Sequence, residues 1–201
     1  YYMLYKDQLV LTGAIDDVGA PIRATSGKSY RLGIEIDAYV KISNKFNMQP
    51  NIALSSNKNV DFTSSWNGEL VDLGNTDIAF SPNFIAGSNF VYQPFTKLKM
   101  ALLSKFVGEQ YMGNIDSENS ILEAYSITDL NVNYEWKINK GIKSIVFSAL
   151  INNILDEEYE SNGYFYTYDD TWSGPGTTTI EGAGYYPQAG INFLLGATLK
   201  F

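Results

Sequence analysis

The chain has 201 residues, enough for one domain with a substantial core. It contains neither cysteine nor histidine, which excludes disulfides, Cys-ligated metal sites, Ser–His nucleophiles and most zinc chemistry. Its net charge of -8 argues against nucleic acid as a partner, because nucleic-acid-binding proteins present basic patches. No run of eighteen apolar residues occurs, so a transmembrane helix is excluded. Membrane-spanning strands are not excluded, because each needs only about ten residues, half of them polar.

Aromatic residues are abundant, with 15 Tyr, 11 Phe and 3 Trp. A soluble β-sandwich can carry such a load in its core, and a membrane barrel needs it for the girdles at its two interfaces. Residues 1–5 already have the composition of mid-strand, with no initiator Met and no signal-peptide pattern. We therefore expect the chain to be a piece of a longer polypeptide.

Period-two alternation and turn residues predict about eight strands, connected alternately by long loops and short turns. The predicted strands are residues 1–11, 30–42, 46–55, 84–94, 97–106, 128–136, 142–152 and 191–201, with long polar loops at 12–26, 56–81, 108–123 and 164–187. Pro50 is unfavourable inside its predicted strand, because proline has no N–H to donate to the β-ladder. Outer-membrane barrels sort their connections by length in this way, with short turns on one side and long loops on the other. The pattern predicts an all-β, antiparallel up-and-down transmembrane β-barrel.

The two faces of these strands differ in chemistry. In residues 30–42, one face carries Tyr30, Leu32, Ile34, Ile36, Ala38, Val40 and Ile42, and the other carries Arg31, Glu35, Asp37 and Lys41. An Arg or Lys facing lipid near the bilayer midplane costs about 2–4 kcal/mol, and none of the apolar faces carries one. The charged set is expected to form an internal hydrogen-bond and ion-pair ladder or to contact an interior domain. The last strand, residues 191–201, places Phe193, Leu195, Leu199 and the terminal Phe201 on one face.

Several motifs together resemble the end of TonB-dependent outer-membrane receptors, of a Bacteroidetes-like siderophore-receptor type. They are Ile151-Asn152-Asn153-Ile154-Leu155-Asp156, Tyr186-Pro187 and the terminal Lys200-Phe201, with supporting fits at residues 29–35 and 125–134. The resemblance implies that residues 1–201 are the C-terminal part of a 22-stranded barrel whose plug domain and earlier strands are absent. It also implies outer-membrane lipid, the protein's own plug and TonB as partners. Phe193, Leu195, Leu199 and Phe201 then resemble the signal that the outer-membrane assembly machinery recognises.

Candidate ligand-binding residues lie in the loops. Trp66 stands near Asp61 and Asp72. A second aromatic and acidic group comprises Tyr164, Phe165, Tyr166, Tyr168, Asp169, Asp170 and Trp172, of which Tyr166, Tyr168, Asp169, Asp170 and Trp172 are the candidate contacts. Such side chains stack against a chelate or a sugar, although an interface girdle merging into a solvated loop is the simpler interpretation. Asp16-Asp17 and Asp116/Glu118 supply carboxylates suited to Ca²⁺, but without EF-hand spacing, so no metal site is assigned. No cofactor is implied. Glu157 and Glu158 would point to opposite faces of a strand, which makes joint acid–base catalysis unattractive.

These features favour a non-enzymatic segment of an outer-membrane receptor in a Gram-negative bacterium. We expect it to serve TonB-dependent uptake of a large scarce solute, such as a ferric siderophore or a similar iron complex. Two alternatives remain open at this point. One is a complete eight-stranded barrel with a structural or adhesive role, and the other is a soluble β-sandwich that binds carbohydrate.

Overall fold

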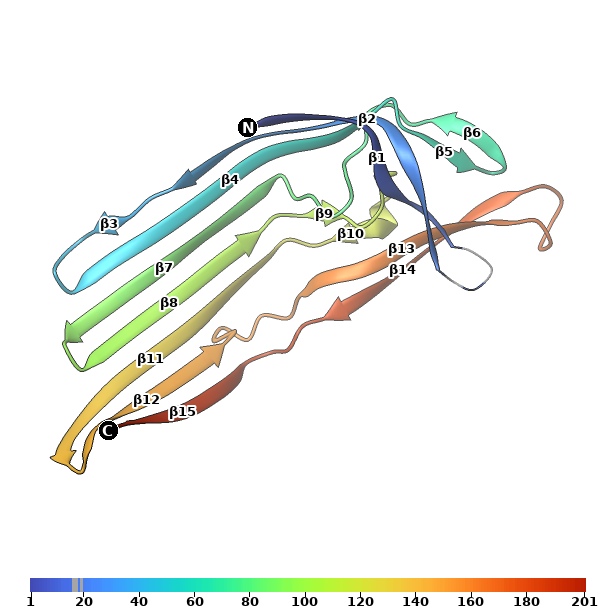
Figure 1. The fold of residues 1–201 in the computed structure, drawn as a ribbon. Helices are drawn as coiled ribbons and strands as arrows, with labels where there is room; N and C mark the ends of the chain where they lie inside the picture. Colours follow the sequence, from blue (N-terminus) through green and yellow to red (C-terminus); the bar gives the residue numbers. More distant parts are fainter. Residues whose placement is uncertain (16–17, 19) are drawn as a thin grey trace.

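A computed structural model describes residues 1–15, 18 and 20–201 of the chain. In this part of the chain, eight long strands follow one another in a single antiparallel sheet (Figure 1). They are β1 (Tyr2–Ile15), β2 (Pro21–Asp37), β4 (Phe46–Val60), β7 (Phe84–Phe95), β8 (Leu98–Val107), β11 (Tyr125–Lys140), β12 (Ile142–Asn152) and β15 (Asn192–Lys200). The short β3 (Val40–Lys41) continues β2 along β4. The all-β, up-and-down antiparallel fold predicted from the alternation is confirmed.

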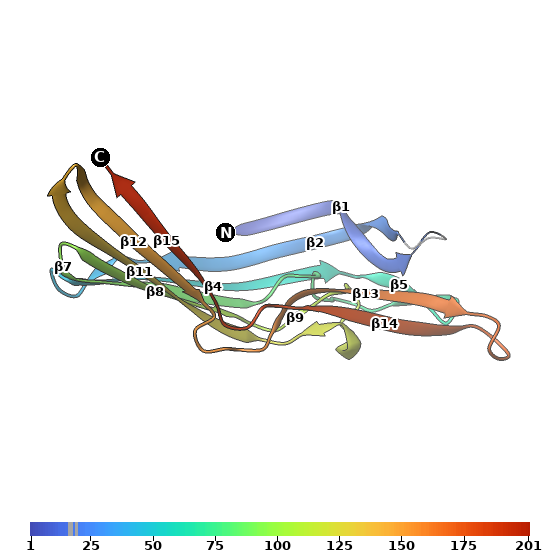
Figure 2. The same ribbon diagram turned by 90° about the horizontal axis from the view of Figure 1, so that it is seen from below.

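The sheet is one layer that bends into a trough, with β1 and β15 at its two margins (Figure 2). Strand twist produces such curvature, because neighbouring strands rotate in one sense. The two margins are not paired with each other, so the described chain is an open segment of a barrel. A β-sandwich would cover the apolar face with a second sheet, but Ile34 is 65% exposed and Leu195 is 74% exposed. The sandwich interpretation is therefore wrong.

Strand register confirms the sorting of the two faces. Cross-strand partners carry the apolar set from one strand to the next: Leu102 pairs with Leu130, Leu130 with Ile151, and Ile151 with Phe193. The neighbouring row, Leu103–Asp129 and Asn152–Asn192, lies on the other face. A shift of one residue in any strand would interchange these rows. The consistent register across eight strands gives the sheet one apolar face and one largely polar face.

Connections are sorted by side of the sheet (Figure 1). Short turns join β3 to β4, β7 to β8 and β11 to β12 at one end, and the last of these uses Gly141 at φ +74°. Longer connections gather at the opposite end. They contain β5 (Thr63–Trp66), β6 (Glu69–Asp72), β9 (Gln110–Tyr111), the 3-10 turn η1 (Glu118–Ser120), β10 (Ile121–Leu122), β13 (Glu160–Asp170) and β14 (Thr178–Pro187).

Three of the predicted loops were wrong in extent. The predicted loop at 12–26 is mostly strand, because β1 and β2 stay paired from Gln8–Ser26 to Leu11–Arg23. The predicted loop at 164–187 is mainly the β13–β14 hairpin, and residues 56–81 contain the end of β4 and the β5–β6 hairpin. At the loop end of the sheet a ladder needs only backbone hydrogen bonds, so polar and glycine-rich sequence continues a strand without apolar alternation.

Pro50 lies within β4 as predicted, where the ladder on one side is interrupted. β2 pairs with β4 up to Asp37–Asn51, and β3 resumes the pairing at Val40–Met48. The Ala38 N–H still donates to the Pro50 carbonyl oxygen at 3.0 Å. The predicted continuous strand 30–42 is therefore divided where proline lacks an N–H.

None of the described helical segments is long and apolar enough to cross a membrane.

Candidate functional site

The predicted ligand-binding residues lie on two hairpins beyond the loop end of the sheet. Trp66 ends β5, while Tyr166, Tyr168, Asp169 and Asp170 belong to β13. Trp172, in the connection from β13 to β14, is 80% exposed. Strand alternation divides the β13 group, because residues 166, 168 and 170 share one face and Asp169 lies on the other. The predicted cluster is thus two surfaces of one hairpin.

Three tyrosines form a row on one face of β13. The ring centroids of Tyr164 and Tyr166 are 6.2 Å apart and those of Tyr166 and Tyr168 are 6.4 Å apart, and each pair of ring planes differs by 18°. Opposite them on β14, Gly184 pairs with Tyr164 and Gly182 pairs with Tyr166. The ends of these two rings fill the space that a Cβ at either glycine would need. The glycines let the tyrosines lie across the neighbouring strand while Tyr164 and Tyr168 stay 50% and 43% exposed.

The opposite face of the same hairpin packs against the other loops. Glu181 Oε2 accepts hydrogen bonds from Ser117 Oγ at 2.8 Å and Asn119 Nδ2 at 2.6 Å. Asn67 and Thr179 exchange two bonds: the Asn67 N–H donates to Thr179 Oγ1 at 2.7 Å, and the Thr179 N–H donates to Asn67 Oδ1 at 2.8 Å. Thr179 Oγ1 also donates to Asp169 Oδ1 at 2.7 Å. The Asn67–Thr179 bonds therefore join the two hairpins, and Asp169 orients the Thr179 hydroxyl that takes part in them.

Gly163 marks the closest approach of the hairpin to the loop that follows β9. A Cβ added at this buried residue would lie 2.5 Å from Met112 Sδ and also against the Gly184 carbonyl oxygen. We expect Gly163→Ala to lower the free energy of unfolding by about 1–3 kcal/mol, the usual cost of overpacking. Faster cleavage of the hairpin in limited proteolysis would report the loosening. Gly174→Ala, which has open space around it, is the matched control and should leave cleavage unchanged.

Asn153 joins three segments at the end of β12. Its N–H donates to Asp129 Oδ1 at 2.8 Å, its Nδ2 donates to the Glu157 carbonyl at 2.8 Å, and its Oδ1 accepts from the Glu157 N–H at 3.0 Å. The residue is 4% exposed and adopts φ +49°, a conformation that Asn tolerates better than most residues. Asp156, also at positive φ, accepts the Ile191 N–H at 2.7 Å. The Asn-Asn-Ile-Leu-Asp motif thus fixes the chain where it leaves β12 and where it returns to begin β15.

A buried polar cluster holds the loop between β6 and β7, which the sequence did not indicate. Asn59, with no exposed surface, donates from Nδ2 to Thr76 Oγ1 at 3.2 Å and to Asn114 Oδ1 at 3.3 Å. Beside it, Lys58 Nζ and Asp77 Oδ1 form an ion pair at 2.8 Å. The Asp77 N–H donates to Asp116 Oδ1 at 2.7 Å. Repeated Asn and Asp in polar loops were the available signal, but the cluster forms only when the end of β4 and two connections fold together.

Asp116 carries a titration that can be tested. Burial, with a smaller contribution from the Asp77 charge, raises the pKa of the Asp116 carboxyl above its ordinary value. An acid with a raised folded-state pKa stabilises the fold most at low pH, and that stabilisation is lost as the pH rises through the folded-state pKa. Asp116→Asn keeps an oxygen to accept the Asp77 N–H. We therefore expect it to raise the free energy of unfolding at neutral pH by less than about 1 kcal/mol and to flatten the acid-side profile. Thermal melts of both proteins from mildly acidic to neutral pH measure this difference.

The calcium alternatives gain no support. The described residues contain no group of three Asp or Glu side chains arranged to hold a metal ion. Asp116 Oδ1 accepts a hydrogen bond from the Asp77 N–H. Asp16-Asp17 lies outside the described residues. Glu157 and Glu158 lie in the exposed connection before β13, so their predicted place on a strand was wrong.

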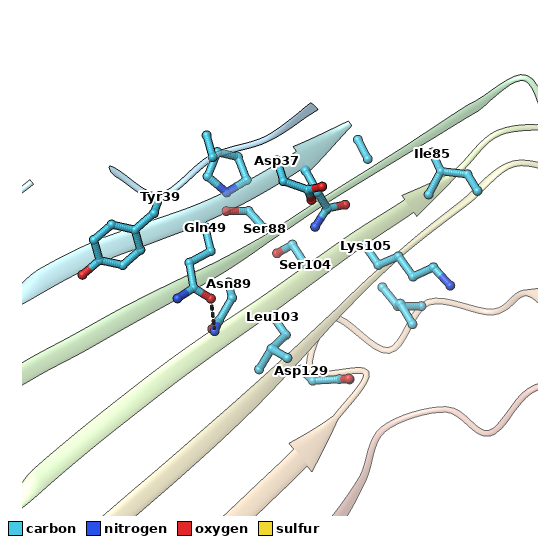
Figure 3. A pocket seen from close by; sticks show the side chains of 16 residues that line it. Asp37, Tyr39, Gln49, Ile85, Ser88, Asn89, Leu103, Ser104, Lys105 and Asp129 are labelled. Atoms are coloured by element: carbon cyan, nitrogen blue, oxygen red, sulfur yellow. Dashed lines mark hydrogen bonds between the residues drawn. The ribbon is translucent and has the colours of Figure 1, made fainter. Parts of the chain in front are cut away.

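The polar face of the sheet contains a broad hollow of about 780 Å³ (Figure 3). Its lining comes from β2, β4, β7, β8 and β11 and includes Asp37, Gln49, Asn89, Lys105 and Asp129. Asn89 Nδ2 donates to Gln49 Oε1 at 3.3 Å across the floor. Nearer the loop end, Arg31 Nη1 donates to Ser81 Oγ at 3.0 Å and to Asn57 Oδ1 at 3.3 Å. The predicted charged face therefore presents mixed acids, bases and amides to an open concavity.

The residues of the predicted assembly signal lie along the β15 margin. Phe193, Leu195 and Leu199 share its apolar face with exposures of 68%, 74% and 50%, and Phe201 follows the strand at 75%. On the polar face of the same strand, Lys200 Nζ lies 3.3 Å from Glu135 Oε1.

No family model matches the sequence, and no curated protein matches it. Solved structures do match. The ferric-catecholate import receptor Fiu from E. coli K12 is 15% identical with a TM-score of 0.63, over 98% of this chain and 24% of that one. The fold is that of a TonB-dependent receptor barrel segment. The siderophore receptor PiuA from Acinetobacter baumannii matches over 98% of this chain and 25% of its own, at 15% identity and a TM-score of 0.62. The copper transporter OprC matches over 96% and 27%, at 15% identity and a TM-score of 0.61. The chain thus spans about a quarter of the length of these receptors.

Proposed function

We propose that residues 1–201 are the C-terminal part of the barrel of a TonB-dependent outer-membrane receptor, in a Gram-negative and Bacteroidetes-like cell. The observation that carries this proposal is the open, single-layer sheet with one lipid-like face and one polar face. The apolar face suits hydrocarbon contact, because its exposed side chains are those that a membrane accepts and a soluble surface does not. A complete eight-stranded barrel is disfavoured, since β1 and β15 remain unpaired with each other.

The solute we propose is a large scarce one, most simply a ferric siderophore or a similar iron complex. Support comes from the receptors that share the fold, whose names include ferric-catecholate, siderophore and copper transport. Fold alone does not determine the solute, so this part of the proposal depends on analogy. The ligand-contacting residues we propose are Trp66, Tyr166, Tyr168, Asp169, Asp170 and Trp172.

The polar hollow suggests how the segment meets its partners. In the proposed receptor, a plug domain of the same protein would occupy the concave side and contact Asp37, Lys105, Asp129 and the amides between them. TonB would act through that plug. Phe201 and the apolar row Phe193, Leu195 and Leu199 would engage the outer-membrane assembly machinery while β15 is still an unpaired margin.

Deleting the gene that encodes this chain tests the proposed function. We expect the protein to fractionate with outer membranes and the deletion strain to lose uptake of a radiolabelled ferric siderophore under iron limitation. Uptake should return with the intact gene and should fail when TonB is removed. A protein that fractionates with soluble material would reject the location, whereas correct location with unchanged iron uptake would reject only the solute.

A further inference from the structure

Charge is distributed very unevenly along the chain. Residues 144–199 contain no Lys or Arg but seven acids: Asp156, Glu157, Glu158, Glu160, Asp169, Asp170 and Glu181. This segment therefore carries -7 of the net charge of -8. It also contains the β13–β14 hairpin and its row of tyrosines.

One of these acids, Asp170, lies on the same face of the hairpin as the tyrosines. Tyr164, Tyr166, Tyr168 and Asp170 occupy alternate positions of β13, so their side chains leave the strand on the same side. Asp170 Oδ1 accepts the N–H groups of Trp172 and Ser173, both at 3.1 Å. A hydrogen bond from the Ser173 side chain, together with these N–H groups, lowers the pKa of the Asp170 carboxyl. Tyr186 extends the row at the other end, with its ring centroid 6.0 Å from that of Tyr164. Tyr164 and Tyr168 leave half or nearly half of their surface exposed on this face.

The tyrosine face with its acid favours some classes of stacking ligand over others. The face of an aromatic ring carries negative potential, which attracts cations within about 6 Å of the ring centroid. Single-stranded nucleic acid also stacks on aromatic rows but requires a basic groove, and this hairpin has acids instead. A compact neutral molecule is usually held in a concave pocket, whereas this row is an open strip.

We propose that the tyrosine row Tyr164, Tyr166 and Tyr168, ending at Asp170, is a binding site for an extended cationic ligand that carries guanidinium or ammonium groups. Guanidinium groups stack on tyrosine faces, and Asp170 supplies an ionised partner at the end of the row. The site does not depend on the proposed transport, because binding requires only the folded hairpin.

Binding of an arginine hexapeptide to the full chain in detergent micelles, measured by calorimetry, tests the site. Tyr166→Leu/Tyr168→Leu keeps an apolar side chain on each position and removes the aromatic faces, so affinity should fall about tenfold for two lost cation–π contacts. Tyr185→Leu is the matched control, because Tyr185 lies on the opposite face of the same hairpin and its hydroxyl donates to the Asn119 carbonyl at 3.3 Å. It should bind the peptide as the original chain does. Asp170→Asn, whose amide oxygen still accepts the loop N–H groups, should weaken binding severalfold.

Titrations with two other ligands, spermine and a neutral oligosaccharide, test which chemistry the site selects. Spermine in place of the peptide shows whether a free polyamine satisfies the site or whether the planar guanidinium is required. Equal peptide affinity in the original chain and the double tyrosine variant would overturn the proposal, since binding would then be general attraction to an acidic protein. A neutral oligosaccharide of N-acetylglucosamine that binds tighter than the peptide, and loses binding in the same variant, would overturn it in favour of sugar stacking.

Discussion

In the proposed outer-membrane receptor, Val132→Arg is expected to block assembly into the membrane, while Asn131→Arg is tolerated. Val132 lies on the apolar face between Met100 of β8 and Ala149 of β12. An arginine there faces hydrocarbon and costs about 2–4 kcal/mol near the midplane. Asn131 is its neighbour on the polar face, where it accepts a hydrogen bond from Asn133 Nδ2 at 2.5 Å. Arginine at 131 would extend into the concave, polar side.

Outer-membrane fractionation and heat-modifiable migration of each variant measure the outcome. The pair is informative because the two substitutions add the same side chain at adjacent positions, so general effects of arginine cancel. Equal assembly of both variants, or failure of Asn131→Arg alone, would contradict the assignment of the apolar face to lipid.

Asn153→Ala is expected to lower the free energy of unfolding by about 2–4 kcal/mol. The substitution removes the side-chain bonds to both backbone groups of Glu157 and leaves those groups without their partners. Each of these part-buried hydrogen bonds contributes about 0.5–1.5 kcal/mol. Alanine also adopts the required φ of +49° less readily than asparagine.

Urea unfolding in detergent, monitored by circular dichroism, measures this loss. Asn152→Ala is the control from the adjacent position, because the Asn152 side chain makes a more exposed bond, from Nδ2 to Asn192 Oδ1 at 2.9 Å. We expect it to cost under about 1 kcal/mol. A smaller effect at Asn153 than at Asn152 would show that the motif does not organise the crossover from β12 to β15.

The sequence predicted the main sheet because one apolar and one polar face impose period two on every strand there. Leu130, Val132 and Tyr134 recur at alternate positions, and the structure places them in register with Met100, Leu102 and Phe147. In β13 both faces mix aromatic and polar side chains, so the alternation of apolar and polar residues that marks a strand is lost. The β13–β14 hairpin was consequently interpreted as a loop, although its glycines opposite Tyr164 and Tyr166 suit a tightly paired ladder.

The sequence predicted which residues the candidate site contains, but not how they are arranged in space. Tyr166, Tyr168, Asp169 and Asp170 were named together because they are neighbours in sequence, but pairing in β13 sends Asp169 to the opposite side. Tyr164 belongs to the same predicted group, and its spacing of two from Tyr166 places it in the row once the segment is a strand. The polar cluster around Asn59 requires partners 17 and 55 residues away, which no local pattern indicates.

The reciprocal bonds between Asn67 and Thr179 connect positions separated by 112 residues. Because the Asn67 amide hydrogen is held by a side chain from the other hairpin, its exchange with deuterium reports undocking of that hairpin as well as fraying of its own. Hydrogen exchange of the Asn67 amide, just after β5, therefore reports the motion of β14. A ligand that rigidifies the tyrosine row should slow this exchange.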